Sequence, residues 1–298
     1  MIVITTPTGD IGSRLLTALL DDAPAHGEEL RVIVRDPARL PGPVRDRVDV
    51  VAGSHGDADV VDRAFAGADA VFWVVPPDPR APSLEDAYLG FTRAATRAFT
   101  DHGVQHVVGV SALGRDTPVA GRAGLVTASL AMDDLIAGTG VSYRALANPS
   151  FMDNLLRQVH SIRDGGVFTD TAAADRRAPT AATRDIASAA AGLLLDRSWT
   201  GVGSVPVLGP EDLSPADMAR IASEVLGTPV RYERQSFDDL RATLTGYGSG
   251  DAFVQGMIDM MRAKDEGLDE GVRRTPESAS PTTFRQWCRE VLRPAVLA

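Results

Sequence analysis

Short runs of apolar, often β-branched residues recur through the first half of the chain, and each run is about long enough for one strand. Several runs carry apolar side chains on both faces, as in Val71 to Val75, which is typical of a parallel sheet covered on both sides. The pattern predicts strands at Ile2 to Thr5, Arg31 to Arg35, Val48 to Ala52, Ala70 to Val75, Val104 to Val110 and Val141 to Leu146.

Between these strands, apolar residues recur at intervals of three and four, which is the period of an amphipathic helix. The predicted helices are Ile11 to Leu20, Asp59 to Ala66, Leu84 to His102 and Thr127 to Gly138. Strands that alternate with helices form right-handed βαβ units. We therefore expect an α/β fold with a doubly wound parallel sheet of the Rossmann type over residues 1–150.

The alternation weakens after Pro149, where helical patterns dominate. We expect residues 151–298 to form a smaller, helix-rich region that covers a cleft, with some segments rejoining the sheet. The predicted helices are Phe151 to His160, Thr183 to Leu195, Pro215 to Leu226, Phe237 to Thr245, Asp251 to Ala263 and Thr282 to Leu292, and the predicted strands are Ser204 to Leu208 and Pro229 to Tyr232. The stretches Gly246 to Gly250 and Lys264 to Gly271 are expected to be loops.

Composition narrows the possible partners. The chain has 298 residues, with 30 basic and 40 acidic side chains and a formal net charge of −10. This charge repels nucleic-acid phosphates and anionic membrane surfaces, so neither is expected as a partner. The single cysteine, Cys288, cannot form an internal disulfide, and no zinc-site spacing occurs. Without a basic leader or a long apolar run, a cytoplasmic location and no bound metal are expected.

A glycine-bearing turn separates the first strand from the first helix. Gly9 would let the backbone approach a pyrophosphate, and Gly12 would let the helix pack closely on its strand. Amides at the helix start would then face the anion. Thr6 stands where the full fingerprint has its first glycine, and a tight turn without a ligand would use the same residues. The predicted phosphate-binding residues are Thr6, Thr8, Gly9, Asp10, Ile11 and Gly12.

Charged residues follow the predicted second and third strands. Arg35 would pair with the 2′-phosphate of NADP(H), whereas Asp36, after a one-residue shift in register, would bind the ribose diol of NAD. Arg35 favours NADP(H), and a solvated Arg–Asp pair is the alternative without a ligand. Asp57 is a candidate acceptor for the adenine amino group. Val75 and Pro76, after the fourth strand, would form a wall beside the ribose.

Taken together, these motifs resemble the NmrA-like family, an atypical branch of the short-chain dehydrogenase/reductase superfamily. The resemblance covers nearly the whole chain and is carried by Thr8 to Gly12, Val34 to Pro37, Gly56 to Asp57, Val107 to Gly114, Asn148 to Asn154 and Ser280 to Trp287. It implies a Rossmann-type domain that binds NADP(H) and a small C-terminal region that closes a substrate cleft. Such families include quinone reductases, biosynthetic reductases and non-catalytic cofactor sensors.

The resemblance also implies site residues. Ser111, after the fifth strand, would orient the substrate or the nicotinamide, and Pro149 and Phe151 would line the nicotinamide end of the cleft. Among the histidines, His160 is the candidate proton donor. The wider superfamily uses a Tyr-x-x-x-Lys pair for that proton. The pair is absent from this chain, whose one lysine is Lys264.

Hydride transfer needs mainly a well-placed nicotinamide in a dry pocket, and an electron-poor acceptor can take its proton from water. We therefore expect an NADPH-dependent reductase of a quinone, enone or imine. Two alternatives use the same fold: an NADP(H)-binding sensor with a regulatory protein partner, and a biosynthetic enzyme with non-redox chemistry. A homodimer is compatible with each of these three functions.

Overall fold

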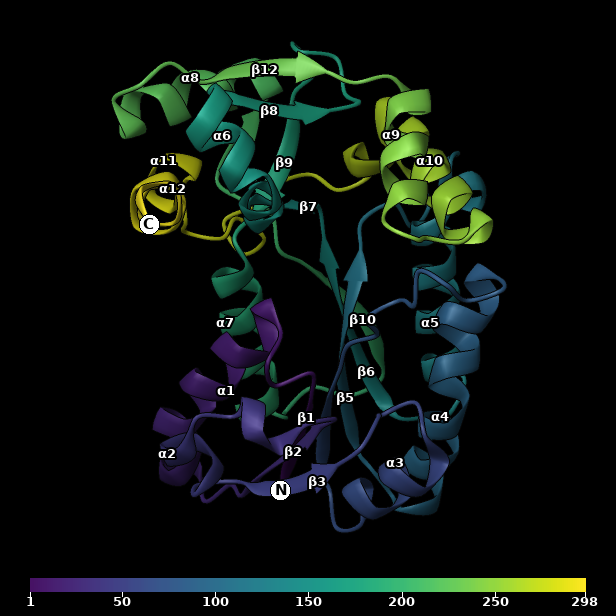
Figure 1. The fold of residues 1–298 in the computed structure, drawn as a ribbon. Coiled ribbons are helices and arrows are strands. Elements are labelled where there is room, and N and C mark those ends of the chain that lie inside the picture. Colours follow the sequence, from purple (N-terminus) through teal and green to yellow (C-terminus); the bar gives the residue numbers. More distant parts are fainter.

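A parallel sheet forms the centre of the molecule (Figure 1). The structure is a computed structural model that describes residues 1–298, apart from the side chains of residues 24 and 25. The sheet order is β10-β6-β5-β4-β1-β2-β3. The bounds are β1 Ile2–Thr5, β2 Leu30–Val34, β3 Asp49–Ala52, β4 Ala70–Trp73, β5 His106–Ala112, β6 Ser142–Asn148 and β10 Val202–Pro206. The order reverses direction between β1 and β4, which confirms the doubly wound fold class.

Helices cover both faces of this sheet, as the apolar strands require. α1 (Asp10–Asp22) and α7 (Thr183–Leu195) pack on one face, and α3 (Ala58–Phe65), α4 (Phe91–Asp101) and α5 (Leu125–Ala137) pack on the other. Alternate residues of one strand therefore enter different cores. In β1, Ile2 and Ile4 lie in the α1 and α7 core, and Val3 lies in the opposite one. Shorter turns complete this half: η1 Ala23–His26, η2 Pro37–Arg39, α2 Gly42–Arg45, η3 Asp86–Gly90 and η4 Ala120–Arg122.

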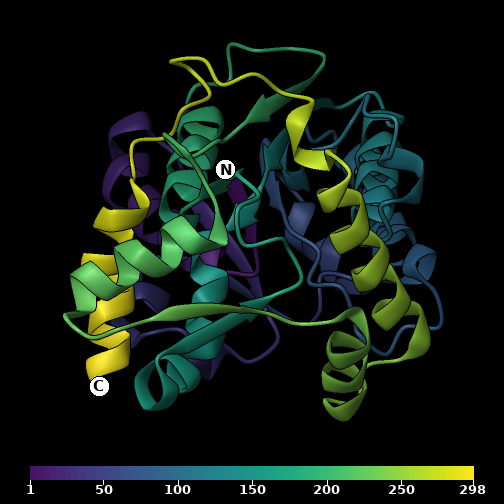
Figure 2. The same cartoon turned by 90° about the horizontal axis from the view of Figure 1, so that it is seen from above.

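A second group of elements lies beyond the carboxyl ends of the strands (Figures 1 and 2). Its small sheets have the orders β11-β9-β7 and β12-β8. The strands are β7 Ser150–Phe151, β8 Val167–Asp170, β9 Ala178–Ala181, β11 Asp212–Leu213 and β12 Arg231–Arg234. The helices are η5 Met152–Gln158, α6 Val159–Gly165, α8 Pro215–Leu226, α9 Phe237–Gly246, α10 Asp251–Asp265, η6 Leu268–Glu270, α11 Phe284–Trp287, η7 Cys288–Leu292 and α12 Arg293–Leu297. We call this group the C-terminal lobe.

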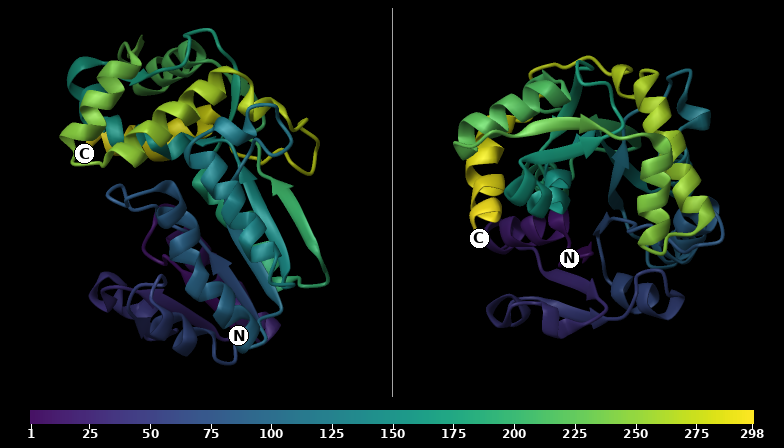
Figure 3. Two further views of the ribbon diagram at one scale, coloured as in Figure 1. Left: turned by 90° about the vertical axis from the view of Figure 1, so that its right-hand side faces the viewer. Right: turned by 45° about the horizontal axis from the view of Figure 1, so that its top comes forward.

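Two buried carboxylates fasten the C-terminal lobe to α7. Asp153 accepts hydrogen bonds from the backbone amide and hydroxyl of Thr183, at 3.0 and 2.8 Å. Asp185 accepts the same pair of bonds from Thr282, at 3.0 and 2.7 Å. Because α7 itself packs against α1, these contacts hold the lobe across the strand ends, as Figure 3 shows from two directions.

Two sequence expectations about the lobe are wrong. The stretch from Lys264 was expected to be a loop, but α10 continues to Asp265, so Lys264 lies on a helix. Phe151 was expected to begin a helix, but it belongs to the two-residue strand β7, which pairs with Thr180 and Ala181 of β9. The second difference arises from pairing with a distant segment, which local periodicity does not encode. Within the described part of the chain, no helix is long and apolar enough to cross a membrane.

Candidate functional site

The reversal of strand order between β1 and β4 creates a crevice at the carboxyl ends of the strands, where ligands of such sheets bind. The segments predicted to bind the dinucleotide follow β1, β2, β3 and β4, so the fold brings them to the same edge of the sheet. Residues from the loop after β6 complete that edge beneath the C-terminal lobe (Figure 1).

The turn after β1 has the form of a phosphate-binding loop. Thr6 adopts a positive φ of 50°, the conformation that the missing first glycine would take easily. A Cβ on Gly12 would lie 2.1 Å from the Thr6 carbonyl oxygen, so only glycine fits there. No described side chain caps the start of α1, in contrast to α8 and α9, whose N-cap serines form capping boxes. The uncapped amides fit a pyrophosphate.

The structure separates the roles of Arg35 and Asp36. The carboxylate of Asp36 accepts a hydrogen bond from the Ala38 amide at 3.0 Å and caps η2, which turns it away from a ligand role. Arg35 directly follows β2, is exposed, and has no ion-pair partner among the described side chains. A guanidinium in this position fits the 2′-phosphate of NADP(H).

Three hydrogen bonds fix the backbone that follows β4. The Thr5 hydroxyl donates to the Phe72 carbonyl at 2.9 Å and accepts from the Val74 amide at 3.0 Å. His55 Nε2 contacts the Val74 carbonyl at 2.8 Å, and burial lowers the pKa of His55 to about 4. The ring is therefore neutral near pH 7 and donates this bond. These bonds hold the backbone so that Val75 and Pro76 lie at the carboxyl edge of the sheet, just after β4.

Asp57 lies nearby, at the start of α3. Its side chain is exposed and makes no capping bond to the helix. Its carboxylate is therefore available to a ligand at the end of β3. The loop geometry, the uncapped α1 amides, Arg35 and Asp57 together fit an adenine dinucleotide with a 2′-phosphate.

A cavity of about 270 Å³ lies within the C-terminal lobe, and its lining includes β7, which follows β6 directly. Its wall is mainly apolar and includes Phe151, Phe168, Met218, Met257, Met260 and Met261. Polar side chains also line it, and among them Lys264 Nζ contacts Asp269 Oδ2 at 2.6 Å. Asp170 lines the same pocket, and burial raises the pKa of its carboxyl group. We call this space the methionine pocket.

Ser111 belongs to a different polar cluster. Its hydroxyl donates to Asp133 of α5 at 2.5 Å, and the Tyr143 hydroxyl donates to the same carboxylate at 2.6 Å. Burial raises the pKa of Asp133 to about 6, although both hydrogen bonds and the nearby Arg115 act to lower it. Ser111 and Asp133 line a cavity of about 210 Å³ on the α5 side of the sheet, which shares no lining residue with the methionine pocket.

The predicted proton donor does not meet Ser111. His160 is exposed on α6, and its Nδ1 accepts a hydrogen bond from Arg163 at 2.7 Å. It does not line the methionine pocket. By contrast, Phe151 lines that pocket, and Pro149 is buried in the loop just before it.

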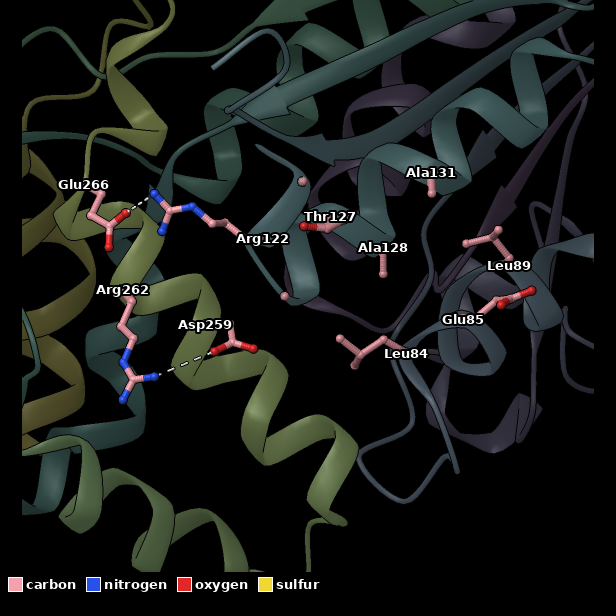
Figure 4. A pocket seen from close by; sticks show the side chains of 12 residues that line it. Leu84, Glu85, Leu89, Arg122, Thr127, Ala128, Ala131, Asp259, Arg262 and Glu266 are labelled. Carbon is pink, nitrogen blue, oxygen red and sulfur yellow. Dashed lines mark ion pairs between the residues drawn. The ribbon is translucent and has the colours of Figure 1, made fainter. Parts of the chain in front are cut away.

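A larger hollow lies in a different place. About 630 Å³ of space lies outside α5, between η3 and α10 (Figure 4). Its charged groups pair with one another: Arg122 with Glu266 at 2.5 Å, and Arg262 with Asp259 at 4.0 Å. None of the residues predicted for cofactor or catalysis lines it. The volume of a pocket therefore does not by itself identify a candidate substrate site. The mainly apolar wall of the methionine pocket, which includes Phe151, makes it the better candidate.

The sheet order and the uncapped glycine loop define a Rossmann-type dinucleotide-binding protein. The profile of the NAD(P)H-binding family matches residues 7–197, and the chain belongs to this family. It is 32% identical over 247 residues to (4-alkanoyl-5-oxo-2,5-dihydrofuran-3-yl)methyl phosphate reductase of Streptomyces griseus, covering 82% of this chain and 80% of the relative. It is 26% identical to quinone oxidoreductase 2 of Escherichia coli, covering 91% and 89%.

Solved structures show the same fold. Triphenylmethane reductase of Citrobacter sp., complexed with NADP(H), has a TM-score of 0.79 at 20% identity and covers 97% of this chain and 99% of its own. NmrA, a negative transcriptional regulator in complex with NADP, has a TM-score of 0.70 at 15% identity, covering 98% and 94%. The expected NmrA-like fold is confirmed. The Streptomyces griseus and Escherichia coli relatives are named as a reductase and an oxidoreductase, which supports the general class of NAD(P)H-dependent reductase.

Three residues of the site were missed in the sequence. Thr5 gave no signal, because a threonine at a strand end is common. Asp133 interrupts an otherwise apolar helical pattern, which marks a buried carboxylate that needs partners. Lys264 follows Met257, Met260 and Met261 at helical spacing, and this spacing would have placed it on one helix face with them.

Proposed function

We propose that the protein is an NADPH-dependent reductase of small, electron-poor conjugated acceptors of the quinone, enone or imine type. The observation that carries this proposal is the methionine pocket, which is lined by Phe151 of β7 and by methionines of α10. Its mainly apolar wall suits a small aromatic or conjugated ligand. The methionine side chains adapt to flat rings and make favourable sulfur–aromatic contacts.

The names of the matched relatives support the same acceptor class. The Streptomyces griseus relative is named for an unsaturated oxo-dihydrofuran that carries an alkanoyl group, which is a conjugated acceptor. The Escherichia coli relative is named for quinones. In both kinds of acceptor, the carbon that takes a hydride is conjugated to an electron-withdrawing oxygen.

The chain provides distinct groups for each part of the cofactor. The loop after β1 would hold the pyrophosphate, and Arg35 would hold the 2′-phosphate. When bound, the cofactor supplies the hydride. The residues that we assign to cofactor binding are Thr6, Thr8, Gly9, Asp10, Ile11, Gly12, Arg35, Asp57, Val75, Pro76, Pro149 and Phe151.

We assign different roles to Ser111 and His160, the two residues that the sequence offered for catalysis. Ser111 donates its hydroxyl hydrogen to Asp133, so we assign it a positioning role at the end of β5. His160 is exposed and bonded to Arg163, and we assign it no step. The sequence has no Tyr-x-x-x-Lys pair, and a conjugated acceptor reduces the need for one because its developing charge is delocalised.

Consumption of NADPH with a panel of quinones, unsaturated ketones and imines tests the proposal. We expect two-electron reduction of at least one conjugated acceptor, with one NADPH oxidised for each acceptor reduced, and much slower reduction of plain ketones. Tight NADPH binding without oxidation by any member of the panel would contradict the proposal and favour a cofactor sensor.

A further inference from the structure

We propose that Lys264 binds the oxygen of the acceptor that becomes negatively charged on reduction, and that it donates the proton to that oxygen. This inference rests on the proposed reductase function and assigns the group that replaces the missing Tyr-Lys pair. It depends on three features of the methionine pocket: the face of α10 that lines it, the spare hydrogen-bond donors of Lys264, and the position of this residue relative to Phe151.

One face of α10 lines the pocket. Met257, Met260 and Met261 lie three and four residues apart, and Lys264 continues the same stripe one turn later. The stripe of methionines on α10 therefore ends at the ammonium group of Lys264. This group belongs to the one lysine of the chain, and its side chain is 17% exposed. A partly buried cation at the end of an apolar pocket is well placed to meet a polar substituent of a ligand.

The ammonium group of Lys264 has more hydrogen-bond donors than the structure assigns to acceptors. It carries three N–H groups, and the structure assigns one of them to Asp269 at 2.6 Å. The neighbouring cation Arg176 is already engaged by the Asp265 carbonyl and by Glu270. The anions that face Lys264 are Asp269 from η6, Asp170 from β8 and Asp265 from α10. The third cation of the pocket wall, Arg157, is exposed, so Lys264 is the partly buried cation whose donors are not all assigned.

Phe151 and Lys264 line the same pocket, and Phe151 is next to the nicotinamide in our assignment. A conjugated acceptor in this pocket would therefore lie between the cofactor and a cation. In a quinone or enone, the hydride enters at one atom and the negative charge appears on an oxygen several bonds away. A donor placed at that oxygen stabilises charge where it develops, which is the most effective position for electrostatic catalysis.

The step is balanced. The acceptor gains a hydride, which carries two electrons, and its carbonyl oxygen becomes an alkoxide-type or phenolate-type anion. A new O–H bond forms as one N–H bond of Lys264 breaks, and the neutral amine regains a proton from solvent. NADPH, the acceptor and one solvent proton thus give NADP⁺ and the dihydro product.

Three variants test this role: Lys264→Met, Lys264→Arg and the control Arg262→Met. Arg262 is a cation two residues away on the same helix, but it points to the separate hollow shown in Figure 4. Equilibrium binding of naphthoquinone and of naphthalene is measured without cofactor, and single-turnover reduction of naphthoquinone is measured with NADPH. NADPH affinity reports that each variant is folded.

We expect Lys264→Met to weaken naphthoquinone binding about tenfold, the value of a lost hydrogen bond to a charged group, and to leave naphthalene binding unchanged. Single-turnover reduction should slow about 100-fold. Lys264→Arg should restore binding, but reduction should remain slower than in the wild type, because a guanidinium does not release its proton. Arg262→Met should behave like the wild type in both assays.

A purely structural role for Lys264 predicts a different result. If Lys264 only neutralises Asp269, the double variant Lys264→Met, Asp269→Asn should regain wild-type binding and reduction. That rescue would overturn the inference, as would equal losses for naphthoquinone and naphthalene, or no loss for either. If wild-type protein binds NADPH but reduces no acceptor, the reductase function fails instead, whatever the binding assays show.

Discussion

Arg35 and Asp36 are adjacent at the end of β2, yet only one of them is available to a cofactor. Asp36 caps η2, whereas Arg35 is exposed without a partner among the described side chains. Register therefore decides between a carboxylate and a guanidinium for the adenosine ribose. The sequence left both open, because a shift of one residue exchanges them.

Replacing Arg35 with alanine should weaken NADPH binding by about 1.5–3 kcal/mol and leave NADH binding nearly unchanged. The lost interaction is a charge-assisted bond to a phosphate that NADH lacks. Titration of both cofactors by fluorescence or calorimetry measures the difference. The control is Arg39→Ala, which removes another exposed arginine at the end of η2. Equal losses for both cofactors would show that Arg35 is structural.

The buried ring of His55 should make the protein less stable in acid. Its pKa is about 4 in the folded chain and 6.5 in the unfolded chain. Between these values the unfolded chain takes up the proton and the folded chain does not, so stability falls as pH falls from 6.5 to 4. The loss amounts to about 3 kcal/mol. Denaturant unfolding at several pH values should show that His55→Gln loses less stability than the wild type between pH 6.5 and 4.

Asp133 should make the protein more stable in acid, which is opposite to the effect of His55. Its pKa is about 6 in the fold against an ordinary 3.8, so the folded chain takes up the proton first as pH falls. Stability from this group therefore rises between pH 6 and pH 4, by about 3 kcal/mol. Asp133→Asn should remove this gain and make the protein more sensitive to acid than the wild type. An unchanged pH profile in that variant would contradict the assignment.

At the scale of single elements, the turn between β1 and α1 uses its two glycines for different purposes. A Cβ on Gly12 would overlap the Thr6 carbonyl, whereas a Cβ on Gly9 would lie 3.4 Å from the same oxygen, within tolerable contact. Gly12 permits close packing of α1, and Gly9 leaves room for a ligand.

The variant Gly12→Ala should therefore lose mainly stability, whereas Gly9→Ala should lose mainly cofactor binding. Gly12→Ala should lower the free energy of unfolding by about 1–3 kcal/mol, because the backbone must shift to relieve the overlap. Gly9→Ala should change stability by less than about 1 kcal/mol, since its backbone is extended, and should still weaken cofactor binding. Thermal unfolding and NADPH titration of both variants separate the two effects. Equal destabilisation by both would contradict this division.

At the scale of the whole molecule, the C-terminal lobe depends on a few buried polar contacts with α7. Asp185 accepts two bonds from Thr282, and its replacement leaves a buried amide and a buried hydroxyl unpaired. Asp185→Ala should lower the free energy of unfolding by about 2–4 kcal/mol in urea. Asp196→Ala, which changes an exposed carboxylate just beyond α7, should have little effect. Similar stability of the two variants would show that the Thr282 contact does not hold the lobe.

Most of the first half of the fold could be predicted from the sequence, because the patterns that specify it are local. The alternation of apolar strands with amphipathic helices placed every strand of the parallel sheet within about two residues. The turn after β1 and the place of Arg35 at the end of β2 were predicted for the same reason, because strand, turn and helix are consecutive in the chain; their binding roles stay predictions. Ser111 was predicted at the correct strand end, but its partner Asp133 was not.

What only the tertiary structure decided lies mainly in the C-terminal lobe. Strand β7 has two residues and exists because β9, some thirty residues later, pairs with it. Likewise, Lys264 and Phe151 are distant in sequence and line one pocket only after the lobe itself has folded. The sequence by itself determined the sheet and its nucleotide loop, since each depends on neighbours along the chain. Which side chains meet around the substrate depends on long-range packing, and periodicity carries no information about that.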